Sequence, residues 1–312
     1  MNRTLVSGSL AYDRIMDFPG KFRDHFLPDK LHSISVGFSV STPVEQFGGT
    51  AGNIAYTLSL LEEHPEIISS VGSGFAPFRE HLLKHGIDTE SVQTIEDIPT
   101  ASAYTITDED DNQISAFSGE ACEKPYTKLI DTKRYAHAIV SPGCIEDMVA
   151  IPRLCRENEI PFFYDPGQRI PALSKEQLEL GVMGAEAVFA NDYEINLIEK
   201  KTGLDEKGLL TRTKALVITY GVEGSRIVTN EGEKQVAATR VEHPIDPTGA
   251  GDAYRAGFLK GALTSLPLEV CGFLGSVAAA YAVEKYGTQK HSFTLPEFRA
   301  RFGDAYGTKC PI

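Results

Sequence analysis

The segment Asp246–Leu259 holds the residues best suited to chemistry. Three small residues, Gly249, Ala250 and Gly251, follow a β-type run that ends at a proline, and Asp252 then opens an apolar helical pattern. Small residues leave backbone N–H groups uncovered at a helix N-terminus, where the helix dipole is positive, so this turn predicts an anion site. A carboxylate beside that site could take a proton from an attacking hydroxyl. The segment therefore indicates phosphoryl transfer to an alcohol.

A second glycine-rich segment, Gly48-Gly49-Thr50-Ala51-Gly52-Asn53-Ile54-Ala55, precedes a helical pattern over Asn53–Leu61. Backbone without side chains can approach a ligand closely, and the Asn53 amide can both donate and accept hydrogen bonds. The segment is neither a dinucleotide fingerprint nor a Walker A loop, since no Gly-Lys-Ser/Thr occurs in the chain. Taken alone, each of the two segments could equally be an ordinary glycine turn with a helix cap.

Short apolar runs alternate with helical patterns along the chain, which predicts an α/β fold with a mostly parallel sheet. The runs are Thr4–Val6, Ala138–Val140, Phe162–Tyr164, Ala187–Phe189, Leu216–Ile218 and Arg226–Val228. The helical patterns are Asn53–Leu61, Pro77–Lys84, Met148–Asn158, Tyr193–Lys200 and Asp252–Leu263. Parallel sheets bind ligands at the carboxyl ends of their strands, where this chain places Asp13, Asp165, Asn191 and Gly221.

Two segments interrupt this alternation, residues 14–47 and 100–118. The first contains the alternating run His32–Val36, and the second forms a hairpin pattern around a polar turn at Asp108–Asn112. We expect them to form a small β-sheet, split in sequence, that covers the main sheet as a lid. A lid suits phosphoryl transfer because closure excludes water that would compete as the nucleophile.

Composition bounds the remaining possibilities. The 312 residues suit one α/β domain spanning residues 1–312 with its lid. A formal net charge of -13 argues against nucleic-acid or anionic-membrane partners, which need clustered Lys and Arg. Five widely spaced cysteines predict reduced thiols, and no secretory or membrane-spanning run is present in the sequence. We therefore expect a cytoplasmic enzyme.

The two glycine-rich segments, roughly 200 residues apart, resemble both signatures of the ribokinase-like (PfkB-type) carbohydrate and nucleoside kinase family. The resemblance covers essentially the whole chain. Two segments, Gly8–Asp13 near the N-terminus and Phe47–Tyr56, are most similar to the bacterial adenosine kinase-like nucleoside kinase branch. This resemblance implies a three-layer α/β/α domain with a mostly parallel sheet and a small β-sheet lid.

For the part of the site that binds the phosphoryl acceptor, the resemblance implies that Asp252 is the general base. It implies that the backbone of Gly249, Ala250 and Gly251 is the anion hole. The positions that match sugar-binding residues of the family are Asp13, Gly48, Gly49 and Asn53.

On the nucleotide side, the resemblance implies ATP as co-substrate and Mg²⁺ as cofactor, with Glu194 organising the metal through water. The positions that match ATP-binding residues are Asn191, Glu194, Thr219, Gly221, Gly224 and Thr248, with the adenine at Ala278–Gly287. Asp246 and Thr248 match positions that hold a monovalent cation such as K⁺ in some members. Without the resemblance, Asn191–Glu194 could be only a helix cap and Gly221–Gly224 only a hairpin turn.

The acceptor is predicted from the absence of a positive side chain. Thr50 stands where many ribokinase-type members have Lys, which favours an uncharged polyol over a sugar phosphate. We predict transfer of the γ-phosphate of ATP to the 5′-hydroxyl of a nucleoside such as adenosine, with Gln168 and Phe117 as candidates for contact with the base.

Three alternatives stay open. The first is a kinase of a free sugar such as ribose or a hexose, because a hydroxyl site would serve either acceptor. The second is a non-catalytic nucleoside or sugar sensor on the same fold, and the third is an oxidoreductase, for which the dinucleotide fingerprint is missing. The protein is expected to be a monomer or a homodimer formed through the lid.

Overall fold

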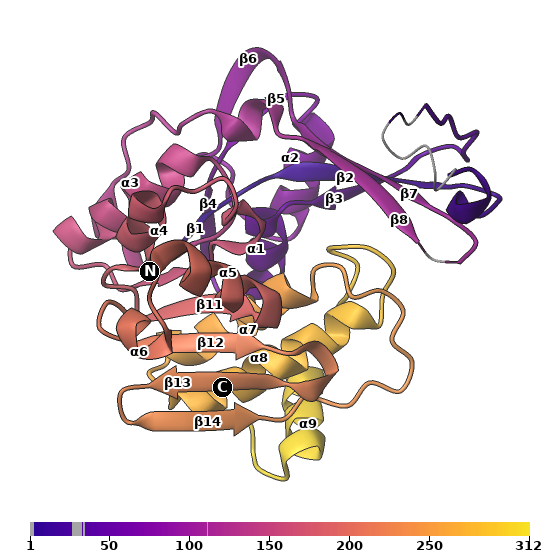
Figure 1. Cartoon of the computed structure of the whole chain (residues 1–312). Coiled ribbons are helices and arrows are strands. Elements are labelled where there is room, and N and C mark those ends of the chain that lie inside the picture. Colours follow the sequence, from indigo (N-terminus) through magenta and orange to yellow (C-terminus); the bar gives the residue numbers. More distant parts are fainter. Residues whose placement is uncertain (1–2, 27–32, 34, 111) are drawn as a thin grey trace.

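An eight-stranded sheet runs through the centre of the protein (Figure 1). The computed structural model describes residues 3–26, 33, 35–110 and 112–312. The strands, in spatial order, are β14 (Gly232–Val236), β13 (Ser225–Thr229), β12 (Ala215–Thr219), β11 (Ala187–Asn191), β10 (Phe162–Tyr164), β9 (Tyr135–Val140), β1 (Arg3–Ser7) and β4 (Pro65–Ile68). All neighbours are parallel except the pairs β12–β13 and β13–β14, so the predicted mostly parallel sheet is confirmed.

Helices cover both faces of this sheet, because its strands carry apolar side chains on both sides. One buried cluster joins the sheet to α3 (Ile145–Glu157), α4 (Lys175–Val182), α5 (Asp192–Thr202) and α6 (Glu206–Leu209). The other cluster joins it to α1 (Thr50–Leu60), α2 (Ala76–Lys84), α7 (Ala250–Leu263) and α8 (Leu268–Val283), and α9 (Leu295–Tyr306) packs on α8. The result is the predicted three-layer α/β/α arrangement.

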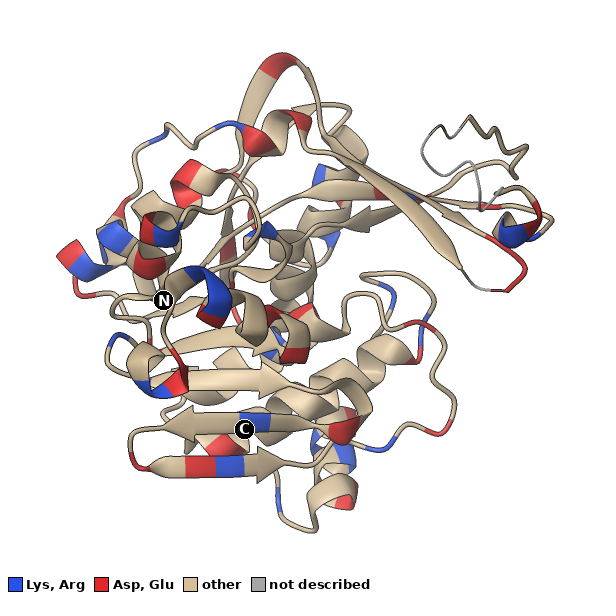
Figure 2. Ribbon diagram, viewed as in Figure 1, with Lys and Arg blue, Asp and Glu red and all other residues tan. Residues whose placement is uncertain are grey.

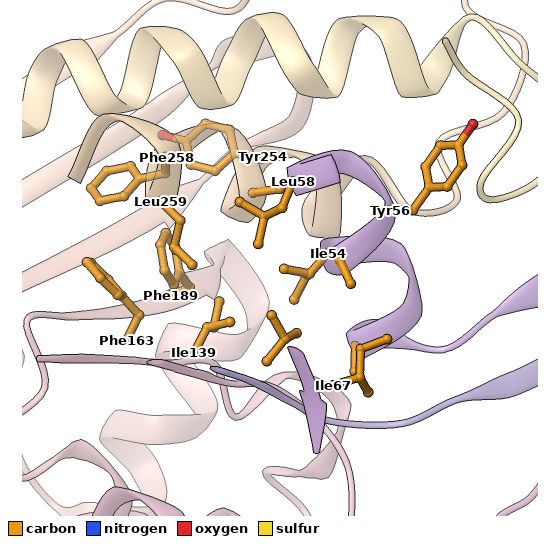
Figure 3. Close-up of a cluster of buried hydrophobic side chains, with 14 of the residues drawn as sticks. Ile54, Tyr56, Leu58, Ile67, Ile139, Phe163, Phe189, Tyr254, Phe258 and Leu259 are labelled. Carbon is orange, nitrogen blue, oxygen red and sulfur yellow. The ribbon is translucent and has the colours of Figure 1, made fainter. Parts of the chain in front are cut away.

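The packing beneath α7 fixes the position of that helix (Figure 3). Phe258 of α7 meets Phe189 of β11 edge to face, with ring centroids 5.2 Å apart. On the other side of α7, a Cβ on Gly257 would lie 2.4 Å from the carbonyl oxygen of Leu274. Only glycine at this position allows α7 and α8 to approach so closely.

A separate four-stranded sheet projects from one end of the main sheet (upper right in Figure 1). Its order is β3 (Val44–Gly48), β2 (Ala11–Asp17), β7 (Ala101–Thr107) and β8 (Gln113–Ser118). β7 and β8 form the predicted hairpin, and the Asp108 carboxylate accepts hydrogen bonds from the backbone amides of Asp110 and Asn112 in its turn.

Two further strands, β5 (Ser70–Ser73) and β6 (Gln93–Pro99), pair with each other. Short 3-10 turns lie at Phe22–Asp24, Glu120–Glu123, Thr132–Arg134, Gly167–Arg169 and Gly221–Glu223.

Two helix starts and one expected strand differ from the sequence-based expectations. α1 begins at Thr50 rather than Asn53, and α7 begins at Ala250 rather than Asp252, because tertiary packing overrides the low helix propensity of glycine. In the run His32–Val36, residues 32 and 34 lie outside the described residues, and Ser35 and Val36 belong to no strand. The strands that the first segment gives to the small sheet are β2 and β3 instead.

The surface carries both signs of charge. Figure 2 shows acidic and basic residues interspersed over the helices and strands. No helix among the described residues is long and apolar enough to cross a membrane.

Candidate active site

The N-terminus of α7 lies at the predicted anion site. Gly249 precedes the helix with a φ of 78°, a left-handed conformation that favours glycine. The Ala250 amide donates to the carbonyl oxygen of Pro247 at 3.1 Å within the turn. Helix geometry leaves the amides of Gly251 and Asp252 without an intrahelical acceptor. These two N–H groups are therefore available to an anion.

The Asp252 carboxylate lies next to these amides and is half-buried. Burial raises its pKa to about 7, although the nearby positive charge of Arg255 and a hydrogen bond from Asn53 oppose that rise. The charges of Asp165 and Asp13 add to it. A carboxylate with a pKa near neutrality is suited to accept a proton from a hydroxyl and to release it again.

Asn53, from α1, lies between Asp252 and a residue far along the chain. Its Nδ2 donates to Oδ2 of Asp252 at 2.8 Å, and its Oδ1 accepts from Nε2 of Gln289 at 3.0 Å. The structure therefore brings two predicted site residues together. Asn53 keeps one amide proton for a ligand, because an amide nitrogen carries two.

Asp13, on β2, lies near enough to Asp252 for its charge to raise the pKa of that residue. A Cβ on Gly48 would lie 2.2 Å from Oδ2 of Asp13, so only glycine leaves room for this carboxylate. Burial raises the pKa of Asp13 to about 6; the Thr288 hydroxyl, 3.3 Å from Oδ2, lowers it, and the charge of Asp246 raises it. Gly49 precedes α1 with a φ of 82°, and a Cβ there would meet the Ser9 carbonyl oxygen at 2.5 Å.

A buried ion pair between Arg255 and Asp165 connects α7 to the main sheet. Arg255 and Asp165 are 7% and 2% exposed, and Nη2 of Arg255 donates to Oδ1 of Asp165 at 2.9 Å, with a second contact from Nε to Oδ2. Nη1 of the same guanidinium donates to the Gly251 carbonyl oxygen at 2.9 Å. Arg255 thus ties the anion site to the end of β10.

The predicted nucleotide side lies at the ends of β11 and β12. Asn191 and Glu194 form a capping box, in which each side chain accepts a hydrogen bond from the other's backbone amide at 2.8 Å. Asn191 is also paired in register with Thr219. Gly221 and Gly224 take φ values of 58° and 95° in the connection from β12 to β13, which is a hairpin. Asn191–Glu194 is therefore a helix cap and Gly221–Gly224 a hairpin turn, and the ATP-binding role of both segments stays a prediction.

Glu194 also faces the buried ion pair. Burial and the charge of Asp165 raise its pKa, while the Asn191 amide and Arg255 lower it. Its Oε1 receives no hydrogen bond from the described residues, so this oxygen can hold a metal-bound water. Within the same residues, no group of three or more His, Cys, Asp or Glu side chains forms a ready metal site.

Asp246 links the turn before α7 to the loop after α8. Its Oδ1 accepts from the Thr248 amide at 2.9 Å and its Oδ2 from the Gly287 amide at 2.8 Å. The two segments matched to the cation-holding and adenine positions are therefore in direct contact.

Among the described residues, no hydrogen bond joins Gln168 or Phe117 to Asp252 or Asn53. Gln168 is exposed in the turn after β10, and Phe117 is 52% exposed on β8. Register places Phe117 opposite Ala103 and Ala103 opposite Asp13, so Phe117 and Asp13 share one face of the small sheet. That geometry is compatible with base contact, which stays a prediction for both residues.

Sequence reasoning missed three residues that organise the site: Arg255, Thr288 and Gln289. Arg255 stands within an apolar helical run, where its partner Asp165 is 90 residues away. Thr288 donates to the Phe47 carbonyl oxygen at 2.6 Å and so connects the loop after α8 to β3. The only local sign was the charge of Arg255 in an apolar helix, and the two loop residues gave none.

These contacts define a class of protein, an α/β phosphotransferase that acts on an alcohol. The family model for the pfkB family carbohydrate kinase matches residues 22–294. The chain belongs to the pfkB family of carbohydrate kinases, and the predicted ribokinase-like phosphotransferase is confirmed.

Relatives extend this comparison. The chain is 36% identical over 275 residues to a nucleoside kinase of Methanothermobacter thermautotrophicus, covering 85% of this chain and 87% of the relative. It is similar in structure to the nucleoside kinase of Burkholderia thailandensis in complex with inosine, with a TM-score of 0.90, 36% identity and coverage of 98% and 99%. The Methanocaldococcus jannaschii nucleoside kinase gives a TM-score of 0.87 at 26% identity, with coverage of 97% and 99%.

Proposed function

We propose that this protein is a nucleoside kinase that transfers the γ-phosphate of ATP to the 5′-hydroxyl of a nucleoside such as adenosine or inosine. The observation that carries the proposal is the Asp252 carboxylate, with a pKa of about 7, beside the uncovered amides of Gly251 and Asp252. The relatives named nucleoside kinase, one of them in complex with inosine, support a nucleoside as the acceptor.

In the proposed reaction Asp13 and Asn53 hold the sugar hydroxyls and place the 5′-hydroxyl beside Oδ1 of Asp252. This oxygen takes the hydroxyl proton as the acceptor oxygen attacks the γ-phosphorus, and the bond from that phosphorus to the bridging oxygen of ADP breaks. The amides at the start of α7 stabilise the negative charge on the phosphoryl oxygens. Asp252 then returns the proton to solvent.

The charges around the site favour an uncharged acceptor. Asp13 and Asp252 would repel a phosphate on the sugar, and the nearby cation Arg255 is paired with Asp165. Thr50 offers no compensation, because its hydroxyl donates to the Pro142 carbonyl oxygen at 2.8 Å. A free sugar such as ribose would meet the same hydroxyl contacts, so contact of the base with Gln168 and Phe117 is the part of the proposal that favours a nucleoside.

The proposal includes Mg²⁺ and K⁺. Mg²⁺ binds proteins through few carboxylates and several waters, which fits the single available oxygen of Glu194. When bound, it would neutralise charge on the ATP phosphates. Each oxygen of Asp246 accepts one amide and keeps a second lone pair, which fits a K⁺ ligand beside Thr248. The proposal further includes closure of the small sheet as a lid, assembly as a monomer or homodimer, and a cytoplasmic location.

The test is ADP release from Mg·ATP with a panel of nucleosides and free sugars, for the wild type and Asp252→Asn. We expect turnover with purine nucleosides. Asp252→Asn should lower kcat by at least roughly 10²–10⁴, the usual contribution of a general base.

Each outcome has a clear meaning. Nucleoside binding without ADP release would identify a sensor rather than a kinase. Turnover with ribose or hexoses alone would replace the nucleoside by a free sugar. A fully active Asp252→Asn variant would remove Asp252 from the role of base.

A further inference from the structure

A line of hydrogen-bonded side chains runs from Asp252 away from the predicted substrate. Asn53 donates to Asp252 at 2.8 Å, and Gln289 donates to Asn53 at 3.0 Å. The Oε1 of Gln289 lies 3.0 Å from Nε2 of His81, on α2. Three separate parts of the fold therefore support one carboxylate.

The carboxylate sets the direction of every bond in this line. An ionised carboxylate can only accept, so Asn53 must present its amide nitrogen to Asp252. The Asn53 oxygen then faces Gln289, which must present its own nitrogen. The Gln289 oxygen therefore faces His81, and His81 Nε2 must carry a proton. While Asp252 is ionised, no other arrangement of the two amides satisfies all three contacts.

The line is buried and tightly held. Asn53 and Gln289 are 8% and 4% exposed, and Gln289 keeps a φ of 55°, which is rare for a residue with a side chain. A Cβ on Gly52 would lie 2.9 Å from Nε2 of Gln289, so the glycine of α1 makes room for the amide. A strained backbone that presents one buried amide to another points to a specific role.

His81 is fixed by packing as well as by its hydrogen bond. Its ring stacks on Phe47 with centroids 4.4 Å apart and lies 4.5 Å from the ring of His85. Burial and the facing groups His85, Lys290 and Lys84 hold its pKa at about 4, against the hydrogen bond to Gln289. His81 is therefore neutral near pH 7 and serves as a donor of fixed orientation.

We propose that Gln289 and His81 are positioning residues, which lock the Asn53 amide so that it donates to Oδ2 of Asp252 and leaves Oδ1 for the acceptor hydroxyl. This inference rests on the proposed function, in which Asp252 is the base. Without the lock, Asn53 can rotate and turn its oxygen toward the carboxylate. The ionised form of Asp252 then loses a hydrogen bond, so its pKa rises and less of the base is active at neutral pH.

The experiment compares variants by the pH dependence of kcat/KM for the nucleoside. Gln289→Met keeps the length of the side chain but removes both hydrogen bonds, and His81→Phe keeps the aromatic packing but removes the donor. We expect each to lower kcat/KM at pH 7 roughly tenfold and to move the acidic limb of the profile upward by roughly half to one pH unit. The KM for ATP should stay unchanged.

Two further variants separate positioning from folding. His81→Gln restores an N–H donor and should recover most of the rate. His85→Phe changes the neighbouring ring of the same aromatic cluster, makes no contact with Gln289, and should behave as the wild type. The charges that face Asp252, from Arg255, Asp165 and Asp13, are the same in all these variants.

A Gln289→Met variant with the wild-type rate and acidic limb would overturn the inference, as would equal losses in His81→Phe and His85→Phe. If Asp252→Asn were fully active, the proposed base itself would fail, which is a separate result. Should His81→Phe not fold, the profile of Gln289→Met decides alone.

Discussion

At the scale of single residues, the properties that suit Asp252 to catalysis also cost stability. Burial raises its pKa to about 7, well above the ordinary value of a carboxyl group. Between that ordinary value and pH 7, the folded protein holds a proton that the unfolded chain has released. The free energy of unfolding therefore falls as the pH rises through this range, because the folded state must bury a charge.

This linkage predicts a stability gain when the charge is removed. Asp252→Asn, neutral at every pH, should raise Tm relative to the wild type at pH 8, and the difference should shrink toward zero near pH 4. Thermal unfolding of both proteins from pH 4 to pH 8 measures this difference. A gain that grew toward acid pH would contradict the raised pKa.

The site was predictable from sequence at the residues that stand in compact motifs. Asp252 and Asn53 each open or follow a glycine-rich turn, and the structure joins them by a hydrogen bond. Gln289 and Thr288 could not be predicted, because their partners lie 236 and 241 residues earlier and a polar loop gives no local sign of them. Contacts of that range are set by the tertiary fold alone.

At the scale of elements, α7 depends on one buried ion pair. Arg255 ties its first turn to Asp165 and donates to the Gly251 carbonyl oxygen. Burying two charges gains little by itself, whereas leaving one of them unpaired is costly. The pair therefore fixes where the helix N-terminus lies more than it adds to stability.

We expect Arg255→Met to lower the free energy of unfolding by about 3–5 kcal/mol, because it leaves the Asp165 charge buried without its cationic partner. Urea unfolding measures the loss. Arg153→Met, which breaks an exposed i,i+4 pair with Glu157, is the matched control and should cost less than about 0.5 kcal/mol.

Adding Asp165→Asn to Arg255→Met should recover part of that stability, since the unpaired charge is gone. A loss below about 1 kcal/mol in Arg255→Met would show that water or a rearranged neighbour replaces the guanidinium.

Elements were predictable where the pattern was strong. The strand Phe162–Tyr164 was predicted to the residue, and the hairpin of β7 and β8 was predicted from its polar turn. Helix starts were placed three residues late in α1 and two late in α7 (Thr50 against Asn53, Ala250 against Asp252), because glycine has a low helix propensity and the tertiary packing that overrides it leaves no local sign. The helices α4, α6, α8 and α9 were not predicted.

At the scale of the whole molecule, the candidate site has two sides built from different parts of the chain. The proposed acceptor side joins β2, α1 and the loop after α8, and the proposed nucleotide side joins the ends of β11 and β12. Each ligand should therefore order its own set of segments.

Hydrogen exchange measures that separation. A nucleoside alone should protect backbone amides of β2, α1 and residues 288–289, and a non-hydrolysable ATP analogue alone should protect residues 219–224 and 278–287. Protection of the same segments by both ligands would contradict the two-sided arrangement. Apo protein at the same concentration is the reference.

The hydrogen bond between Asn53 and Gln289 joins residues 236 positions apart. During protein synthesis the N-terminal part of a chain emerges first and begins to fold first. The ribosome must therefore translate past residue 289 before Asn53 can receive its partner. Asn53 emerges early, whereas Asp252 stands only 37 residues before Gln289, so the proposed base would acquire its final orientation only near the completion of translation.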